Sequence, residues 1–160
     1  MSRRAGFAAL LVALAAAGAA GAAEPGGQSR LTPAEIAGLV GGGAGPGSSG
    51  VAGIRTTVLS GDPTRAGPYT IALSAPANVS IAAHSHQDER TAVVVSGTWW
   101  FGYGPKAEAA ALKPLPPGSF YTEPAGVAHF ARTGAEPVTI YISGFGPTDT
   151  RYVDPAQAPK

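Results

Sequence analysis

Three histidines are the residues of this sequence best suited to bind a metal ion. His84 and His86 stand two residues apart in AHSHQDER, directly after an apolar run. Residues two apart on a strand point to the same face of a sheet, so both imidazoles are expected on one side. The third, His129, begins another predicted strand after a Pro-Gly turn. We therefore predict a three-histidine metal site, with a hydrogen-bonded polar cluster as the alternative.

Such a site would leave a coordination position open to water or to a substrate oxygen. Zn, Fe, Mn and Ni all accept imidazole ligands, so the predicted cofactor is a divalent transition metal whose identity the sequence leaves open. The chain contains no cysteine. Any further ligand must therefore offer nitrogen or oxygen, and no disulfide holds the fold.

The histidines need strands to position them, and the sequence from Val51 onward consists of strand and turn signals. Short apolar or alternating segments, separated by Gly, Pro and Asn turns, predict about seven to nine strands. No helical segments alternate with them, so a parallel sheet is disfavoured and an antiparallel sandwich or barrel is expected. The stretch RTAVVVSGTWWFGYG is either one long strand or two strands with a kink at Gly97.

One short helix is predicted ahead of the strands, in LTPAEIAGLVGGG. Thr32 can cap it, Pro33 suits its first turn, and Glu35 lies three residues after the cap. The predicted organisation is a signal peptide at 1–23, a linker with the short helix at 24–50, a β-barrel at 51–147 and a C-terminal tail at 148–160.

The first 23 residues have the layout of a secretory signal peptide: Arg3 and Arg4, an apolar run, and small residues before a cleavage site at Ala22 or Ala23. A membrane anchor is the alternative. We expect export to the periplasm or the medium, with no membrane partner after cleavage. Without Arg3 and Arg4, nine of the 11 basic residues remain against ten acidic ones. Such a balance offers no basic field, so nucleic acid is not an expected partner.

Two stretches resemble the signature motifs of the cupin superfamily. HSHQDERTAVVVSG is similar to the first motif, G-x5-H-x-H-x3,4-E-x6-G, and GSFYTEPAGVAHF to the second, G-x5-P-x-G-x2-H-x3-N. The matching positions are His84, His86 and Gly97, then Gly118, Pro124, Gly126 and His129. The resemblance spans Ile71 to about Phe145. It implies an all-β fold, an antiparallel double-stranded β-helix of the cupin or jelly-roll barrel type, here with a short N-terminal helix. It also makes a homodimer a fair expectation.

Three positions depart from these motifs. The leading glycine of the first motif falls at Asn78, the final asparagine of the second at Thr133, and the family glutamate, a common fourth metal ligand, at Arg90. Glu89 is one residue short of that slot, and a one-residue shift turns a strand side chain to the opposite face. Either the loop after His86 adjusts so that Glu89 reaches the site, or the fourth ligand is missing.

Arg90 has three interpretations. On the surface it would pair with Asp88 or Glu89 and do little else. Inside the barrel it would repel a cation and bind an anionic substrate beside it. The third interpretation is a site that has lost its metal.

Glu123, directly before Pro124, is the second candidate catalytic residue beside Arg90. Its carboxylate could serve as a metal ligand, as the partner of a ligand or as a general base. A solvent-facing position at a sheet edge is the slightly favoured alternative. Tyr152 and Arg151, after the last predicted strand, are candidates for closing over the barrel mouth.

Two functional hypotheses follow. The resemblance implies a metal-dependent enzyme of dioxygenase, isomerase or lyase type, acting on a small molecule, in which His84, His86 and His129 hold the ion. In that enzyme Arg90 or Glu123 would orient the substrate or move a proton. The alternative is a non-catalytic cupin that binds or senses a small ligand or a metal, because the family glutamate is missing. An empty structural barrel is a third, weaker option.

Overall fold

The computed structural model describes residues 27–39, 41, 43 and 45–160. The predicted signal peptide lies outside these residues. Helix α1 (Pro33–Gly38) has the expected capping box, in which Thr32 accepts from the Glu35 N–H and the Glu35 carboxylate accepts from Thr32. No helix within the described residues is both long and apolar enough to cross a membrane.

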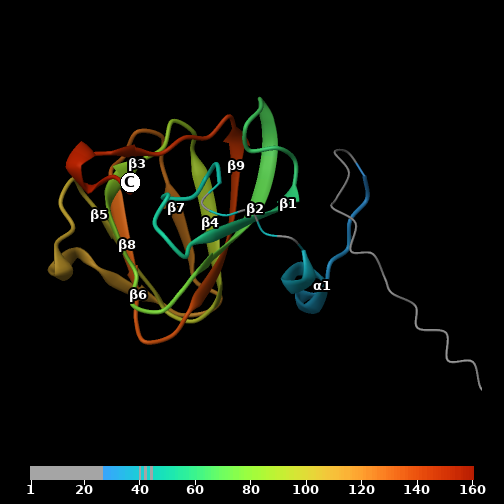
Figure 1. The fold of residues 1–160 in the computed structure, drawn as a ribbon, viewed down its shortest axis with the longest axis horizontal. Helices are drawn as coiled ribbons and strands as arrows, with labels where there is room; N and C mark the ends of the chain where they lie inside the picture. Colours follow the sequence, from blue (N-terminus) through green and yellow to red (C-terminus); the bar gives the residue numbers. More distant parts are fainter. Residues whose placement is uncertain (1–26, 40, 42, 44) are drawn as a thin grey trace, which may run out of the picture.

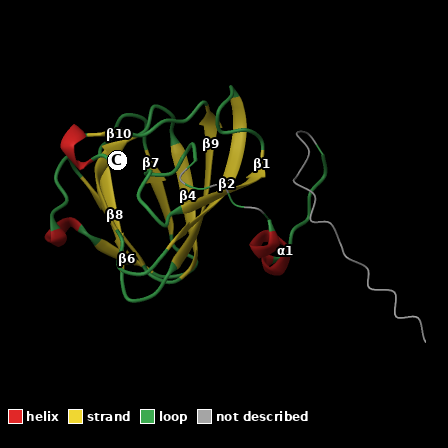
Figure 2. Cartoon of the chain, in the orientation of Figure 1, coloured by secondary structure: helices red, strands yellow, loops and turns green. Residues whose placement is uncertain are grey.

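Within the described residues, ten strands form two antiparallel sheets of five, which face each other (Figures 1 and 2). Sheet 1 has the order β1-β2-β9-β4-β7, and sheet 2 has the order β10-β3-β8-β5-β6. The strands of sheet 1 are β1 (Arg55–Ser60), β2 (Gly67–Ala75), β9 (Val138–Gly146), β4 (Arg90–Ser96) and β7 (Phe120–Glu123). The strands of sheet 2 are β10 (Arg151–Tyr152), β3 (Ser80–Ser85), β8 (His129–Thr133), β5 (Trp99–Tyr103) and β6 (Lys113–Leu115). This arrangement confirms the predicted all-β barrel.

The stretch from residue 90 to 104 is two strands, and they belong to different sheets. Gly97 lies between them with φ +72°, and a Cβ there would lie 2.3 Å from the Pro137 carbonyl oxygen. A residue with a side chain would meet both a strained backbone and a clash, so glycine is required where the chain passes from sheet 1 to sheet 2. Two short 3₁₀ turns, at Ala109–Ala111 and Pro155–Gln157, complete the described elements.

The core lies between the sheets and consists of the inward-facing residues of both. It is built mainly from branched aliphatic and aromatic side chains, among them Ile71, Ile140, Ile142, Val94, Trp99, Phe101 and Tyr121. Trp99 and Phe101 point inward as the alternation of β5 predicts, while Trp100 faces the other way and carries the Arg132 guanidinium over its ring. Such interdigitation fixes the strand register, because a slip of one residue would bury the polar face.

The segment predicted as a C-terminal tail contributes the edge strand of sheet 2. Arg151 and Tyr152 pair with Ser85 and His84, so the end of the chain lies against the strand that carries His84 and leads directly to His86. A two-residue strand leaves no periodic signal in the sequence.

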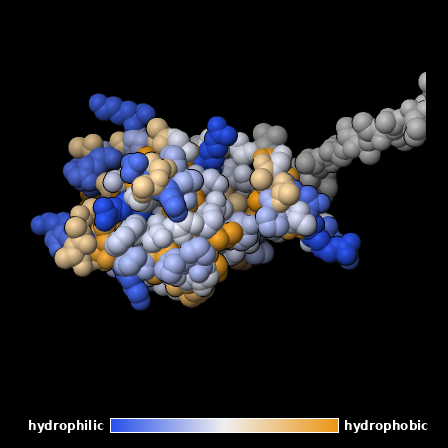
Figure 3. Space-filling view, turned by 90° about the horizontal axis from the view of Figure 1, so that it is seen from below, coloured by the Kyte–Doolittle hydropathy of each residue, from blue (hydrophilic) through white to orange (hydrophobic). Residues whose placement is uncertain are grey.

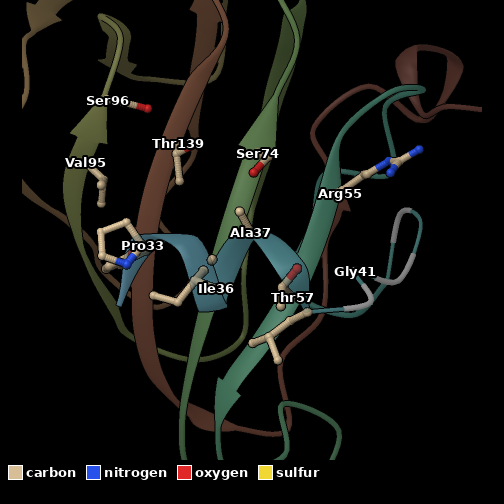
Figure 4. A pocket seen from close by; sticks show the side chains of 13 residues that line it. Pro33, Ile36, Ala37, Gly41, Arg55, Thr57, Ser74, Val95, Ser96 and Thr139 are labelled. Atoms are coloured by element: carbon tan, nitrogen blue, oxygen red, sulfur yellow. The ribbon is translucent and has the colours of Figure 1, made fainter. Parts of the chain in front are cut away.

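Helix α1 lies across the outer face of sheet 1, and a groove of about 470 Å³ separates the two (Figure 4). Pro33 and Ile36 of the helix line it together with polar strand residues such as Thr57, Ser74 and Thr139. The face shown in Figure 3 mixes hydrophilic and apolar residues. Exposed apolar side chains such as Val93, Phe120 and Phe145 suit a contact between copies of the chain, and a homodimer stays a prediction.

Candidate metal centre

His84 and His129 lie directly opposite each other on β3 and β8. Between Ile81 and His84 strand β3 advances three residues, while β8 advances two, from Ala131 to His129. Ile81 is buried in the core, and strict alternation would turn His84 to the outer face. The extra residue on β3 is a bulge that reverses this, so His84 also points inward.

The three imidazole rings come together inside the barrel. Ring centroids are 4.5 Å apart for His84 and His129, 5.0 Å for His84 and His86, and 5.1 Å for His86 and His129. One ligand nitrogen from each ring lies within 4.8 Å of the others, and all three residues are buried. The sequence spacing therefore predicted the grouping correctly.

Each imidazole is held in the form that binds metal. Nδ1 of His84 lies 2.8 Å from Ala82 O, Nδ1 of His129 lies 3.1 Å from Val127 O, and Nδ1 of His86 contacts Asp149 O. A carbonyl oxygen only accepts, so each Nδ1 carries the proton and each Nε2 keeps its lone pair. Metal-binding histidines are commonly oriented by such contacts.

The rings are also uncharged. Burial is the main cause that lowers the pKa of His84 to about 4 and that of His86 to about 3, and it lowers the pKa of His129 as well. For His86 the nearby Arg90 guanidinium adds to the effect. All three imidazoles are therefore neutral at pH 7, as metal ligation requires.

A buried ion pair from sheet 1 lies beside the histidines. Arg90 on β4 and Glu123 on β7 are direct cross-strand partners and are only 2% and 4% exposed. Arg90 Nε donates to Glu123 Oε2 at 2.6 Å, and Nη2 contacts the same oxygen. Nη1 donates to Gly47 O at 3.0 Å, and Nη2 also donates to His86 Nε2. All three guanidinium nitrogens are thus engaged inside the protein.

These positions correct two expectations. Arg90 is not a surface residue, and Glu123 does not face solvent. Glu89 is exposed and does not reach the histidines. Asp88 points inward but bonds to Tyr69 and Thr148 instead of Arg90. The physical reason for Arg90 is the alternation of β4, which turns Arg90, Ala92 and Val94 inward. Residues 86–89 form a loop in which Asp88 is buried and Glu89 is exposed.

The ion pair is charged at neutral pH. Burial acts to raise the pKa of Glu123, but Arg90, followed by His129 and His86, lowers it to about 2. Burial likewise acts to lower the pKa of Arg90, and Glu123 leads the contacts that raise it overall. A buried carboxylate of such low pKa is a weak base, so Glu123 is better suited to hold a cation than to remove a proton.

No protein-family model matches the sequence, and no curated protein does either. Among solved structures, the polyketide cyclase RemF from Streptomyces resistomycificus aligns with TM-score 0.64 and 17% identity over 82% of this chain and 89% of its own. A sugar phosphate isomerase of the cupin superfamily from Silicibacter pomeroyi aligns with TM-score 0.47 and 18% identity over 59% of this chain. A DMSP lyase aligns with TM-score 0.49 and 22% identity over 58% of this chain.

The protein has a β-barrel fold of the cupin or jelly-roll type. This confirms the fold that the two motifs implied. The chain spans 60% of the length of the isomerase and 47% of that of the lyase.

The departures from the cupin motifs have structural explanations at two positions. Asn78, where the motif has glycine, adopts φ +59°, a left-handed conformation that asparagine tolerates better than most residues. Thr133, where the motif has asparagine, donates to Pro76 O at 2.7 Å and accepts from the Val79 N–H at 2.9 Å. Both residues therefore serve the turn that leads into β3.

The residues of this site fit a divalent transition metal. His129 Nε2 is buried without a hydrogen-bond partner in the described part of the chain, as expected for an atom that binds an ion. The donors are imidazole nitrogens with a carboxylate 3.8 Å away from two of them. A small cavity of about 20 Å³ adjoins the histidines and is lined by Trp99, Phe101, Ile140 and Ile142.

The barrel mouth is covered by two segments, of which the sequence marked only the second: the loop at 47–50 and the tail. The loop from Gly47 to Gly50 bonds to the tail: Thr150 donates to Ser48 O at 2.8 Å and Tyr152 to Ser49 O at 2.6 Å. The Tyr152 ring lies 5.5 Å from that of His84, whereas Arg151 points to solvent and pairs with Asp149. Of the two predicted mouth residues, only Tyr152 lies against the site.

Proposed function

We propose that this protein is an exported, single-domain cupin that binds a divalent transition metal through His84, His86 and His129 and acts there on a small molecule. The reaction would be of dioxygenase, isomerase or lyase type. The observation that carries the proposal is the shared orientation of three buried, neutral imidazoles, each with Nδ1 on a backbone carbonyl.

A bound ion would supply Lewis acidity toward an oxygen atom of the small molecule. The protein supplies orientation and exclusion of water. Backbone carbonyls fix the three rings, and the apolar wall formed by Trp99, Phe101 and Ile142 limits the size of what can lie beside them. Arg90 keeps a positive charge next to the histidines, which would favour an anionic group of the small molecule.

A non-catalytic role in binding or sensing a metal or small ligand is the second candidate. It is supported by the size of the cavity, about 20 Å³, which is roughly the room that one water molecule needs. A larger substrate would have to displace the loop at Gly47–Gly50. A protein that only captures an ion needs no such opening.

The metal content of the protein tests the proposal. Wild-type protein purified without added metal should carry about one equivalent of a transition metal, and the H84A/H129A variant less than about a tenth. Ser85→Ala, between His84 and His86, is the control and should keep its metal. A wild-type protein that contains no metal and takes up neither Zn²⁺, Ni²⁺ nor Fe²⁺ in calorimetry would refute the proposal.

Turnover separates the enzyme from the sensor. Oxygen consumption by the metal-loaded protein, measured across catechols, diketones and thiols, should exceed that of H84A/H129A if the protein is an oxygenase. Tight metal binding without turnover of any compound in this panel, or of candidate isomerase and lyase substrates, would favour the sensing role.

Export is tested by the N-terminus of the protein recovered from the periplasm or medium. We expect a chain that begins at Ala23 or Glu24. Full-length protein that stays with the membrane fraction would instead support the anchor.

A further inference from the structure

Glu123 lies within reach of an ion bound by the histidines. Its Oε1 is 3.8 Å from His129 Nε2, and its Oε2 is 3.8 Å from His86 Nε2. These distances are too long for hydrogen bonds, which need about 3.2 Å or less. They suit two ligands of one ion, because metal–nitrogen and metal–oxygen bonds are each about 2.0–2.2 Å long.

The two carboxylate oxygens have different surroundings. Both Arg90 contacts go to Oε2, through Nε and Nη2. Oε1 faces the side of His129, whose Nε2 has no hydrogen-bond partner among the described residues. Glu123 can therefore keep its ion pair through one oxygen while the other faces the centre.

Arg90 stands in the way of the third histidine. Its Nη2 donates to His86 Nε2, and that nitrogen has a single lone pair in its neutral form. The lone pair cannot serve the guanidinium and a metal ion together. Binding of an ion by His86 thus requires Nη2 to leave, while Nε can stay on Glu123.

We propose that Glu123 is a fourth metal ligand, supplied by β7 from the position directly opposite the motif slot that Arg90 fills on β4, and that Arg90 competes with the ion for His86. The inference rests on the proposed function of the three histidines. Of the possibilities weighed from the sequence, it rejects a shifted Glu89 and a missing ligand and selects Glu123 as a metal ligand. The carboxylate is present but comes from the neighbouring strand.

A double-mutant cycle on metal affinity tests this proposal. Zn²⁺ affinity is measured by calorimetry for wild type, E123Q, R90Q and R90Q/E123Q, with folding checked by circular dichroism. We expect R90Q to bind at least about tenfold more tightly than wild type, because the competing cation is gone. E123Q should weaken binding at least about tenfold, both alone and in the R90Q background.

The R90Q background keeps the test decisive, since E123Q alone leaves a buried arginine unpaired and can misfold. If Glu123 is only the counterion of Arg90, R90Q and R90Q/E123Q will bind Zn²⁺ equally, and the proposal is overturned. Glu89→Gln, a matched change on the exposed neighbour of Arg90, should leave the affinity unchanged. The visible absorption bands of Co²⁺-loaded R90Q/E123Q should also differ from those of Co²⁺-loaded R90Q, because the double variant lacks the carboxylate.

The outcomes distinguish this inference from the proposed function. If wild-type protein binds Zn²⁺ through its histidines, and R90Q and R90Q/E123Q bind it with equal affinity, Glu123 is refuted as a ligand and the three-histidine site stands. A wild type and an R90Q that both fail to bind refute the two proposals together.

Discussion

Sheet 2 brings His84 and His129 to the metal centre, and His86 follows directly after β3, whereas sheet 1 brings the charged pair Arg90 and Glu123. Both sets are buried, with His84 opposite His129 and Arg90 opposite Glu123. They differ in what holds them. Each imidazole is oriented by a backbone carbonyl, while each member of the ion pair depends on the other. The comparison shows that one end of a barrel can combine ligands oriented by the backbone with charges that depend on each other.

The largest effect is expected from breaking the ion pair. Glu123→Ala leaves the Arg90 guanidinium buried without its carboxylate, which should lower the free energy of unfolding by about 3–5 kcal/mol. Chemical denaturation of the metal-free protein measures this. The R90M/E123L variant, which removes both charges, should lie within about 1–2 kcal/mol of wild type or above it. Equal losses in the single and double variants would show that the pair is not coupled.

As the pH falls, the histidines and the ion pair should lose their contributions to the free energy of unfolding in two different pH ranges. In the folded protein the pKa of His84 is lowered from its ordinary 6.5 to about 4. As the pH falls, the unfolded chain therefore binds a proton at this histidine before the folded chain does. The stability that is present above pH 6.5 is lost as the pH falls to 4. The loss is on the order of 3 kcal/mol. The contribution of Glu123 disappears lower, between pH 4.5 and about 2. Chemical denaturation of the metal-free protein between pH 7 and 4 measures this. In His84→Gln the free energy of unfolding should change less with pH than in wild type, and an unchanged slope would contradict the role of His84.

The sequence predicted the contribution of sheet 2 better than that of sheet 1. Two histidines at i and i+2, with a third at the motif spacing, identify their common face because alternation is local. The alternation of Arg90, Ala92 and Val94 along β4 was a signal that Arg90 points inward. That Glu123 lies opposite Arg90 could not be deduced, because the register of β4 against β7 is set by contacts between segments about 30 residues apart.

The mouth of the barrel was the least predictable part. Gly47–Gly50 has the composition of a linker, and its three carbonyl contacts involve Arg90, Thr150 and Tyr152, two of which lie about 100 residues away. Backbone acceptors carry no sequence signature. The longer strands and the capped helix, by contrast, follow from local patterns and were predicted, whereas β10 was not.

A smaller effect is expected at Asp88, which joins the loop after β3 to the segment that orients His86. Tyr69 and Thr148 both donate to its carboxylate at 2.7 Å. Asp88→Asn offers one acceptor oxygen in place of two, so one buried hydroxyl loses its partner at a cost of about 1–3 kcal/mol. Thermal denaturation measures the loss. Metal affinity should fall less than in H84A/H129A, and a larger fall would mean that Asp88 itself binds the ion.

The smallest effect is expected at the mouth. Tyr152→Phe removes one hydrogen bond to Ser49 O and should cost about 0.5–1.5 kcal/mol of stability. Because it loosens the cover without touching a ligand, the rate at which a chelator extracts Zn²⁺ should rise while the affinity changes little. An unchanged extraction rate would mean that the ion leaves by another route.

The bulge on β3 allows two residues between Ile81 and His84 where a regular strand would have one. Ile81 packs in the core and His84 faces the same interior because the bulge absorbs the extra residue. Deleting Ala82 would leave the two residues at i and i+2, which regular pleating turns to one face. A homologue that keeps all three histidines but is one codon shorter in this strand would therefore be expected to lack the bulge and to keep the site.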